Sequence, residues 1–236
     1  MIGPTTAHAL LDAAVAAGEL LDETPPTVTI WGFSQGGHAA LFAGELAATY
    51  APGLPLAGIV AFAPATDLRA NIESTQDTTL GTLLVVATAV AWSEDRPDLA
   101  LTDVIRPDSI DAARSLAAQC LSSPELPIAA MRSIQLRDDV ADFDSPRTQA
   151  WAQVLEENTP RGRIGVPVLV LQGRADPIMD VDVTTAHVAA RCAAGDAIEL
   201  RLRPATEHFT LVARSVDDAV AWTEDRLAGE PTVTTC

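Results

Sequence analysis

The chain has 236 residues, of which 32 are acidic and 15 are basic, and its formal net charge is −17. This acidic excess repels phosphate backbones and anionic membrane surfaces, so nucleic acid is not an expected partner. The length allows one sizeable buried core. The longest apolar run, residues 80–92, is shorter than the roughly 20 residues of a membrane-spanning helix, so no membrane segment is expected.

The first 63 residues have the pattern of a β-α-β unit. Helical periodicity and a cap at Thr5 or Thr6 precede a short β-branched run, and a small-residue helix then leads to a continuous apolar run. Such a run is typical of a parallel strand buried on both faces. The expected elements are a helix that stops before Pro25-Pro26, a strand at about 27–32, a helix at 38–49 and a strand at 56–63.

A Gly-x-Ser-x-Gly motif, Gly32-Phe33-Ser34-Gln35-Gly36, lies between the first strand and the helix after it. This context is that of a nucleophile elbow. A serine on a tight strand-to-helix turn needs neighbours without a Cβ, which explains the glycines. The turn would raise the Ser34 hydroxyl above the sheet. It would also place the backbone N–H of Gln35 at a helix N-terminus, facing a developing oxyanion.

Residues 64–165 form a long block that has helical periodicity and several prolines but no convincing strand. It stands between two expected core strands, so we interpret it as a helical insertion that forms a cap or lid. Its apolar stripes either line an acyl pocket or simply pack together. The expected organisation is a first core part at 1–63, the cap at 64–165 and a second core part at 166–236. The expected helices of the cap are 80–92, 109–121 and 145–157.

The last third of the chain repeats the strand-helix alternation. Two apolar or alternating runs are each followed by a polar turn, and helical patterns separate and follow them. The sequence therefore predicts an α/β fold with a mostly parallel sheet of about four core strands. The expected elements are strands at 166–172 and 197–202 and helices at 183–194 and 212–227.

Ser34, Asp176 and His208 occur in the chain order Ser, Asp, His that a nucleophile-elbow fold uses. Asp176 and His208 each follow the carboxyl end of a predicted parallel strand. Both side chains should therefore lie at the sheet edge where the elbow stands. A serine hydroxyl needs a base to take its proton, and the base needs an acid to hold its tautomer. The sequence predicts these three residues as nucleophile, acid and base.

Other polar residues near these positions have ordinary explanations. Asp180 and Asp182 suit a helix N-terminus, which prefers carboxylates, so Asp176 is the better acid. His8 and His187 fall within helix patterns, and His38 is too close to the elbow in sequence to serve as base. Glu207 has the character of a solvated loop charge. No Gly-rich phosphate loop and no metal-ligand spacing occurs in the sequence, so neither a cofactor nor a metal is implied.

The three cysteines, Cys120, Cys192 and Cys236, allow at most one internal disulfide. One alternative is a Cys192–Cys236 bridge that holds the tail of an exported protein. The other is three unpaired thiols. The N-terminus shows no basic region followed by an apolar stretch, so no signal peptide is visible in the sequence as given.

Over almost its whole length the sequence resembles α/β-hydrolases, and more narrowly the secretory lipase family of actinobacteria and fungi. The first motif is shared by many hydrolases, whereas the set of motifs together is more specific. The resemblance rests on residues 31–40 around the elbow, Leu56-Ala57-Gly58 leading to 64–68, residues 167–176, residues 191–195, Glu207-His208 and the terminal Cys236.

The resemblance implies an exported serine esterase or lipase with a helical lid and no cofactor, located outside the cell or in its envelope. Its substrate would be a small-molecule ester or lipid. It assigns Ser34 as nucleophile, Asp176 as orienting acid and His208 as base. Gln35 supplies one oxyanion donor through its main-chain N–H.

The chain departs from the family in two ways. The family has a substantial N-terminal half before the elbow, whereas about thirty residues precede Ser34 here. The family also usually has a glycine near Thr206. With the nucleophile on the outermost strand, an apolar sheet edge is left open. We expect either a truncated product or a homodimer that covers this edge. The predicted function is a carboxylic ester hydrolase with an acyl-enzyme intermediate. The alternatives are a silent hydrolase fragment with a structural or dimerising role, and an acyltransferase with the same triad.

Overall fold

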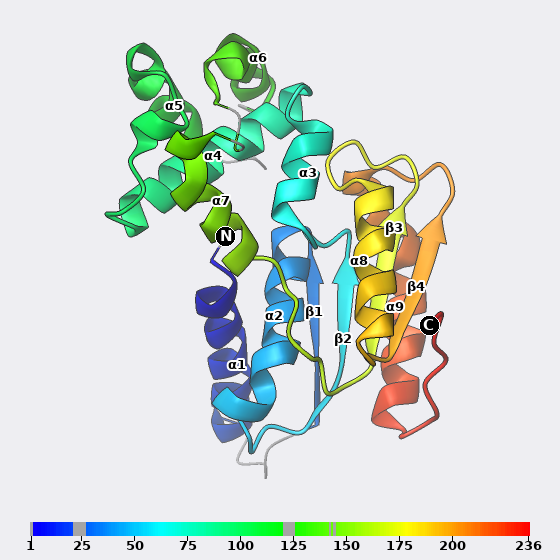
Figure 1. Cartoon of the computed structure of the whole chain (residues 1–236). Helices are drawn as coiled ribbons and strands as arrows, with labels where there is room; N and C mark the ends of the chain where they lie inside the picture. Colours follow the sequence, from blue (N-terminus) through cyan, green and yellow to red (C-terminus); the bar gives the residue numbers. More distant parts are fainter. Residues whose placement is uncertain (1, 21–26, 120–125, 142, 144) are drawn as a thin grey trace. The chain divides into compact units, whose positions relative to one another are not determined.

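The computed structural model describes residues 2–20, 27–119, 126–141, 143 and 145–236 (Figure 1). Pro25, Pro26 and Cys120 therefore lie outside the described residues, as does the end of the predicted helix 109–121. The chain divides into two compact units. One contains residues 2–67 and 158–236, and the other contains residues 68–157. We call them the sheet unit and the helical unit.

The sheet unit is built on four parallel strands in the order β1-β2-β3-β4. This sheet confirms the α/β class and the four core strands predicted from the sequence. The continuous apolar runs became the two central strands because these are covered on both faces. The strands are β1 (Val28–Phe33), β2 (Leu56–Phe62), β3 (Val168–Gly173) and β4 (Ile198–Arg203).

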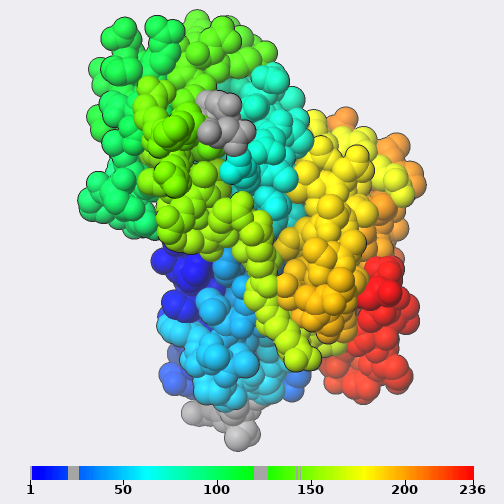
Figure 2. Space-filling view, in the orientation of Figure 1, coloured from blue at the N-terminus to red at the C-terminus, as the bar shows by residue number. Residues whose placement is uncertain are grey.

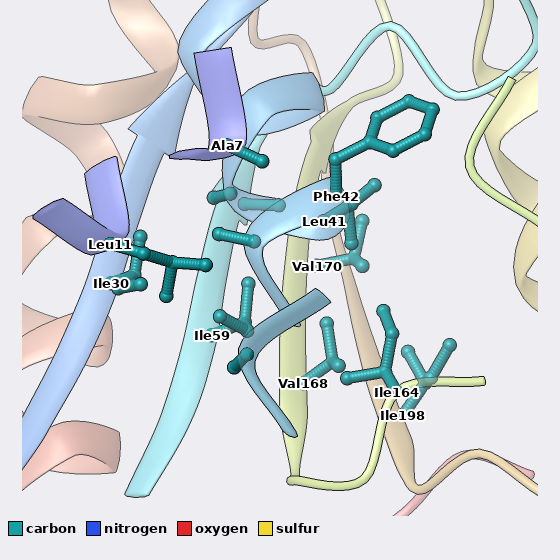
Figure 3. Close-up of a cluster of buried hydrophobic side chains, with 14 of the residues drawn as sticks. Ala7, Leu11, Ile30, Leu41, Phe42, Ile59, Ile164, Val168, Val170 and Ile198 are labelled. Carbon is teal, nitrogen blue, oxygen red and sulfur yellow. The ribbon is translucent and has the colours of Figure 1, made fainter. Parts of the chain in front are cut away.

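Helices cover both faces of this sheet. Side chains from α1 (Gly3–Leu20), α2 (Gln35–Tyr50) and α8 (Val181–Ala193) join one face in a single buried apolar cluster, shown in Figure 3. Ile59 of β2 belongs to this cluster. The neighbouring Gly58 points to the opposite face, where it meets Trp222 of α9 (Leu211–Leu227). A Cβ at Gly58 would come within 2.6 Å of the Trp222 ring, so the missing side chain lets α9 approach the sheet.

The first helix does not start as the sequence indicated. α1 begins at Gly3, two or three residues before the expected cap at Thr5 or Thr6. The Thr6 hydroxyl donates instead to the backbone carbonyls of Gly3, the first residue of α1, and of Ile2, which precedes it. The Gly3 N–H donates to the Asn158 side chain at 2.7 Å, so a residue far along the chain supplies the helix with its N-terminal acceptor.

The helical unit is organised around α4 (Thr79–Asp95), which packs against α3, α5 and α6. The Thr78 hydroxyl caps α4 by accepting from the Gly81 N–H at 3.0 Å. The other helices are α3 (Leu68–Thr75), α5 (Ile110–Ala117), α6 (Leu126–Leu136) and α7 (Gln149–Glu157). Short 3₁₀ turns are η1 (Leu101–Asp103), η2 (Pro107–Ser109), η3 (Arg137–Asp139) and η4 (Pro146–Thr148), while η5 (His208–Thr210) belongs to the sheet unit.

A pocket of about 240 Å³ lies within the helical unit. Four of its six lining residues are polar, and they include both a carboxylate and a guanidinium. This lining does not fit the apolar acyl pocket considered for the helical stripes. The lining residues are Gln76, Asp77, Thr82, Val85, Arg137 and Val140.

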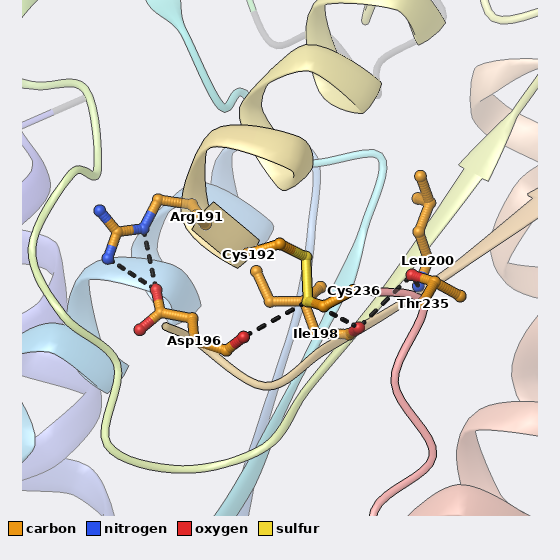
Figure 4. Close-up of a disulfide and its surroundings, with 7 residues drawn as sticks. All are labelled: Arg191, Cys192, Asp196, Ile198, Leu200, Thr235 and Cys236. Atoms are coloured by element: carbon orange, nitrogen blue, oxygen red, sulfur yellow. Dashed lines mark hydrogen bonds and ion pairs between the residues drawn. A yellow bond between two sulfur atoms is a disulfide. The ribbon is translucent and has the colours of Figure 1, made fainter. Parts of the chain in front are cut away.

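A disulfide joins Cys192, at the end of α8, to Cys236 at the chain terminus (Figure 4). This bond confirms the pairing over the alternative of three free thiols. The tethered tail runs along β4, where the Thr235 N–H donates to the Ile198 carbonyl at 2.9 Å and the Thr235 hydroxyl accepts from the Leu200 N–H at 3.0 Å. The tail and the end of α8 therefore lie side by side on the surface, red beside orange in Figure 2.

Candidate active site

Ser34 lies at the turn between β1 and α2 in a backbone conformation that is uncommon for a residue with a Cβ. Its φ is 55° and its ψ is −115°, and its N–H donates to the Phe62 carbonyl at 2.8 Å. The surrounding glycines make room for this turn. A Cβ at Gly32 would overlap the carbonyl oxygen of Gly36, and one at Gly37 would lie 3.0 Å from Pro64 Cβ. Gly36 itself has open space where a Cβ would stand.

Asp176 follows β3 in a loop that surrounds its carboxylate with donors. Oδ1 accepts from the backbone N–H groups of Ile178 and Met179, each at 2.8 Å. Oδ2 faces Nδ1 of His208 at 2.8 Å. The Asp176 side chain is fully buried and that of His208 is 3% exposed. A buried carboxylate needs this set of hydrogen bonds, because each removes part of its desolvation penalty.

Backbone hydrogen bonds hold the acid loop and the histidine loop together. Arg174 N–H donates to the Arg203 carbonyl at 2.9 Å, and Ala175 N–H donates to the Thr206 carbonyl at 3.2 Å. Gly173 allows this approach, because a Cβ there would overlap the same Thr206 oxygen. Before Thr206 the chain turns at Ala205, whose φ of 46° is the left-handed conformation that favours glycine.

The structure brings Ser34, Asp176 and His208 into one hydrogen-bonded chain. His208 Nε2 lies 3.0 Å from Ser34 Oγ, while Nδ1 faces Asp176. Because a carboxylate only accepts, the hydrogen belongs on Nδ1, and Nε2 of the neutral ring then accepts from the serine hydroxyl. The ring centroids of Phe33 and Phe209 lie 4.7 and 5.3 Å from the centroid of the imidazole ring, and these two rings limit its orientation.

Gln35 is the first residue of α2, directly after Ser34. The first amides of a helix have no carbonyl partner within the helix, and the helix dipole adds partial positive charge there. A negative oxygen that forms on a group bonded to Ser34 Oγ would therefore meet a favourable backbone donor at Gln35.

Asp180 and Asp182, the alternatives to Asp176, lie outside the hydrogen-bonded chain, and so does Glu207. Asp180 is the N-cap of α8 and accepts from the Asp182 N–H at 2.8 Å. Glu207 is exposed. These placements match the helix-terminus and loop explanations given for them.

The other histidines are also held elsewhere. His8 stacks on Tyr50, with ring centroids 3.9 Å apart. His187 lies within α8, and burial lowers its pKa to about 4. His38 is fully buried, with Nε2 donating to the Asn158 carbonyl at 2.7 Å, and burial lowers its pKa to about 4. Both groups are thus neutral near pH 7.

The described residues contain no group of three His, Cys, Asp or Glu side chains placed to hold a metal ion. Among the helices that the structure describes, none is both long and apolar enough to cross a membrane.

The structure shows one polar contact of the site that the sequence analysis does not predict. Gln172, at the end of β3, donates from Nε2 to Asp176 Oδ2 at 3.3 Å. The available signal was a single amide that closes the apolar run Val168–Leu171. Polar residues at strand ends are common, so the pattern did not separate it from an exposed position.

A serine on a strand-to-helix turn, with an acid and a histidine after later parallel strands, is the arrangement of an α/β-hydrolase. The model of the family described as secretory lipase (LIP) matches residues 1–235. The chain belongs to this family, as the sequence motifs indicated.

Relatives of known name include lipases. A "probable inactive lipase" from Mycobacterium tuberculosis is 29% identical over 234 residues, covering 95% of this chain and 51% of that protein. "Lipase A" from Arthroderma benhamiae is 25% identical over 209 residues, covering 86% of this chain and 44% of that protein. The chain thus spans about half the length of these curated relatives.

Solved structures share the fold. Candida antarctica lipase A in its closed state superimposes with a TM-score of 0.79 at 18% identity, covering 99% of this chain and 57% of that one. The rice cell wall degrading esterase LipA from Xanthomonas oryzae gives a TM-score of 0.73 at 17% identity, covering 97% and 67%. These likenesses establish the α/β-hydrolase fold of the chain.

Proposed function

We propose that this chain carries the catalytic triad of a carboxylic ester hydrolase of the lipase and esterase type. The observation that carries the proposal is the hydrogen-bonded chain from Ser34 through His208 to Asp176, with distances of 3.0 and 2.8 Å. Membership of the secretory lipase family supports it. The arrangement satisfies the geometric requirement for nucleophile, base and orienting acid.

In this mechanism Ser34 Oγ attacks the ester carbonyl carbon while its proton passes to His208 Nε2. The carbonyl oxygen becomes an oxyanion that accepts from the Gln35 N–H, and Asp176 stabilises the imidazolium. The C–O bond to the alcohol then breaks, and the alcohol leaves with the proton from His208. Water, deprotonated in turn by His208, attacks the acyl-Ser34 ester. The carboxylic acid leaves and Ser34 regains its proton.

The proposed substrates are acyl esters or glycerides outside the cell or in its envelope. Family membership and the names of the relatives support the substrate class. The Cys192–Cys236 disulfide supports an oxidising compartment. If an alcohol instead of water accepts the acyl group, the same residues perform acyl transfer, and product analysis with added alcohol separates the two reactions.

Fluorophosphonate labelling read as intact mass tests the proposal. One adduct per chain is expected for the wild type and none for Ser34→Ala. Ser74→Ala is the matched control, because Ser74 is exposed and its hydroxyl donates to the Asn71 carbonyl of its own helix, and it should label like the wild type. Esters graded from acetate to palmitate would then define the acyl preference. A folded wild type that is neither labelled nor active on any of these esters contradicts the proposal.

A second candidate is a catalytically silent hydrolase unit with a structural or dimerising role. The observation in its favour is that, within the described residues, β1 pairs only with β2 and forms one edge of the sheet. One relative is also named a probable inactive lipase. Open strand edges bind other strands, so a second copy would cover this one.

The mass in solution tests this second candidate. Val28 and Ser34 N–H groups donate toward β2, so by strand alternation the Thr29 N–H points to the open edge. Thr29→Pro removes that donor without removing a bond to β2. A dimer paired through β1 should become a monomer in this variant. A monomeric wild type, or a dimer that Thr29→Pro leaves unchanged, contradicts pairing at this edge.

A further inference from the structure

Gln172 is a fully buried amide in direct contact with the predicted acid. It stands at the carboxyl end of β3 and is 0% exposed. Its Nε2 lies within hydrogen-bond distance of three acceptors, Asp176 Oδ2 at 3.3 Å, the Met179 carbonyl at 3.0 Å and the Gly173 carbonyl at 3.2 Å, which share its two hydrogens. Its Oε1 accepts from the Thr184 hydroxyl at 3.2 Å. Neither Gln172 nor Thr184 takes part directly in the steps of the proposed reaction.

The partners of the amide fix which end faces the acid. A carboxylate oxygen and a backbone carbonyl only accept hydrogen bonds, so the NH₂ end must face Asp176 and Met179. The oxygen end then faces Thr184, which has a hydroxyl hydrogen to donate. Rotating the amide by 180° would set its oxygen against three acceptor oxygens with no hydrogen between them, whereas the Thr184 hydroxyl could still accept from the NH₂ group. The buried network therefore has one satisfied arrangement.

Thr184 secures this arrangement from α8. It is fully buried, and its hydroxyl reaches an amide twelve residues earlier in the chain. The first turn of α8 is thereby connected through Gln172 to the carboxylate that faces His208. The neighbouring Thr185 differs in this respect, because it is exposed and its hydroxyl donates to the Val181 carbonyl of its own helix.

The two oxygens of Asp176 are held in different ways. Oδ1 is fixed by two backbone N–H groups, whereas Oδ2 is shared by the side chains of His208 and Gln172. Of the hydrogen bonds to Oδ2 in the described part of the chain, loss of Gln172 would leave the one from the imidazole. The carboxylate could then turn about its fixed oxygen, and the imidazole would turn with it, away from Ser34.

We infer that Gln172 and Thr184 are positioning residues of the triad, which act through Asp176 to keep His208 aligned with Ser34. The catalytic consequence rests on the proposed function, whereas the hydrogen-bond relay itself does not. Neither residue contacts the substrate in this scheme. Loss of either should therefore lower kcat and leave KM nearly unchanged.

The test uses Gln172→Met, which keeps side-chain length and removes the donor, and Thr184→Val, which keeps shape and removes the hydroxyl. Thr185→Val is the matched control. A hydrogen bond to a charged group contributes enough that Gln172→Met should lower kcat and the fluorophosphonate labelling rate by about 10- to 100-fold. Thr184→Val should lower both by about 3- to 10-fold, because the amide keeps its NH₂ contacts and loses only the partner of its oxygen.

A second measurement does not depend on activity. The proton on His208 Nδ1, bonded to a buried carboxylate, gives a downfield ¹H NMR resonance that is identified by its loss in His208→Ala. We expect this resonance to shift or broaden in Gln172→Met and Thr184→Val, and to be unchanged in Thr185→Val. A merely structural role would lower the melting temperature and leave the resonance, kcat and labelling rate of the folded protein unchanged.

The outcomes separate the two claims. A wild type that is neither labelled nor active, but whose resonance responds to both substitutions, overturns the proposed function and keeps the relay. A labelled wild type whose rate and resonance are unaffected by Gln172→Met overturns the relay. If Gln172→Met does not fold, Thr184→Val alone decides, since an unchanged rate and resonance in that variant overturn the inference.

Discussion

At the scale of single residues, the elbow depends on one glycine more than on its motif partner. A Cβ at Gly32 would overlap the Gly36 carbonyl oxygen, which is backbone and cannot move aside cheaply, whereas Gly36 has open space. We predict that Gly32→Ala lowers the free energy of unfolding by more than about 2 kcal/mol and abolishes labelling of Ser34. Gly36→Ala, within α2 and with open space for its Cβ, should fold with its stability unchanged or raised by up to about 1 kcal/mol. Urea titration and labelling check both, and equal losses would contradict the steric explanation.

At Ala205, in contrast to Gly32, we predict a substitution that raises the free energy of unfolding. Its φ of 46° places an exposed side chain in the left-handed region, where a Cβ costs about 1–2 kcal/mol. Ala205→Gly should therefore raise the free energy of unfolding by about 0.5–1 kcal/mol, after the extra backbone entropy of glycine is subtracted. Ala228→Gly, also exposed but with a φ of −77°, should lower it. Thermal unfolding of both variants measures the difference, and stabilisation by both would exclude the backbone explanation.

At the scale of elements, patterns of burial were readable in the sequence and distant polar contacts were not. The apolar run 56–63 forms β2, at Leu56–Phe62. It could be predicted because a strand that is buried on both faces needs apolar side chains on both of them. The start of α1 was misplaced because its acceptor, Asn158, lies 155 residues away. Periodicity records which face of an element is buried, and carries no information about such a partner.

The candidate site shows the same division. The chain order and the strand ends brought Ser34, Asp176 and His208 to one edge of the sheet in the prediction, and the structure brings them together. The contact between Gln172 and Asp176 depends on the path of the loop after β3, which local composition does not determine. The left-handed turn at Ala205 was equally hidden, because alanine gives no sign of a positive φ.

The tail of the chain offers a prediction about one edge of the sheet. The Cys192–Cys236 bond closes a segment with a sequence separation of 44, and the tail pairs with Ile198 and Leu200 of β4. In the chain-entropy model a loop of this size contributes about 4 kcal/mol. Dithiothreitol should therefore lower the melting temperature and speed hydrogen exchange at the Leu200 amide. The Cys192→Ala/Cys236→Ala variant should already show both changes, and a further effect of the reductant on it would contradict their assignment to this bond.

At the scale of the whole molecule, three buried or partly buried groups link stability to pH. Burial raises the pKa of Glu45 to about 7, opposed by the Gly162 N–H and by the charge of Arg191, and reinforced by Asp196. Burial lowers the pKa values of His38 and His187 to about 4. Between pH 4 and 6.5 the unfolded chain binds protons that the folded histidines do not, so their contribution to stability rises with pH. Glu45 acts in the opposite direction, because between about pH 4.5 and 7 its folded form binds the extra proton.

Replacing Glu45 with glutamine isolates the contribution of Glu45 to the pH dependence of stability. Glutamine keeps an oxygen that can accept from the Gly162 N–H and removes the titrating proton. Glu45→Gln should therefore gain stability relative to the wild type as pH rises from 5 to 8, by about 1–2 kcal/mol after allowance for the solvent that reaches the carboxyl. The matched control is Glu224→Gln, which removes one exposed carboxylate from α9. Urea midpoints at pH 5, 6, 7 and 8 give the comparison. Two results would contradict this prediction: a difference in unfolding free energy between Glu45→Gln and the wild type that stays constant over this range, or one that equals the difference for Glu224→Gln. In either case the Glu45 carboxyl does not titrate between pH 5 and 8, and the change in stability at acidic pH comes from the histidines.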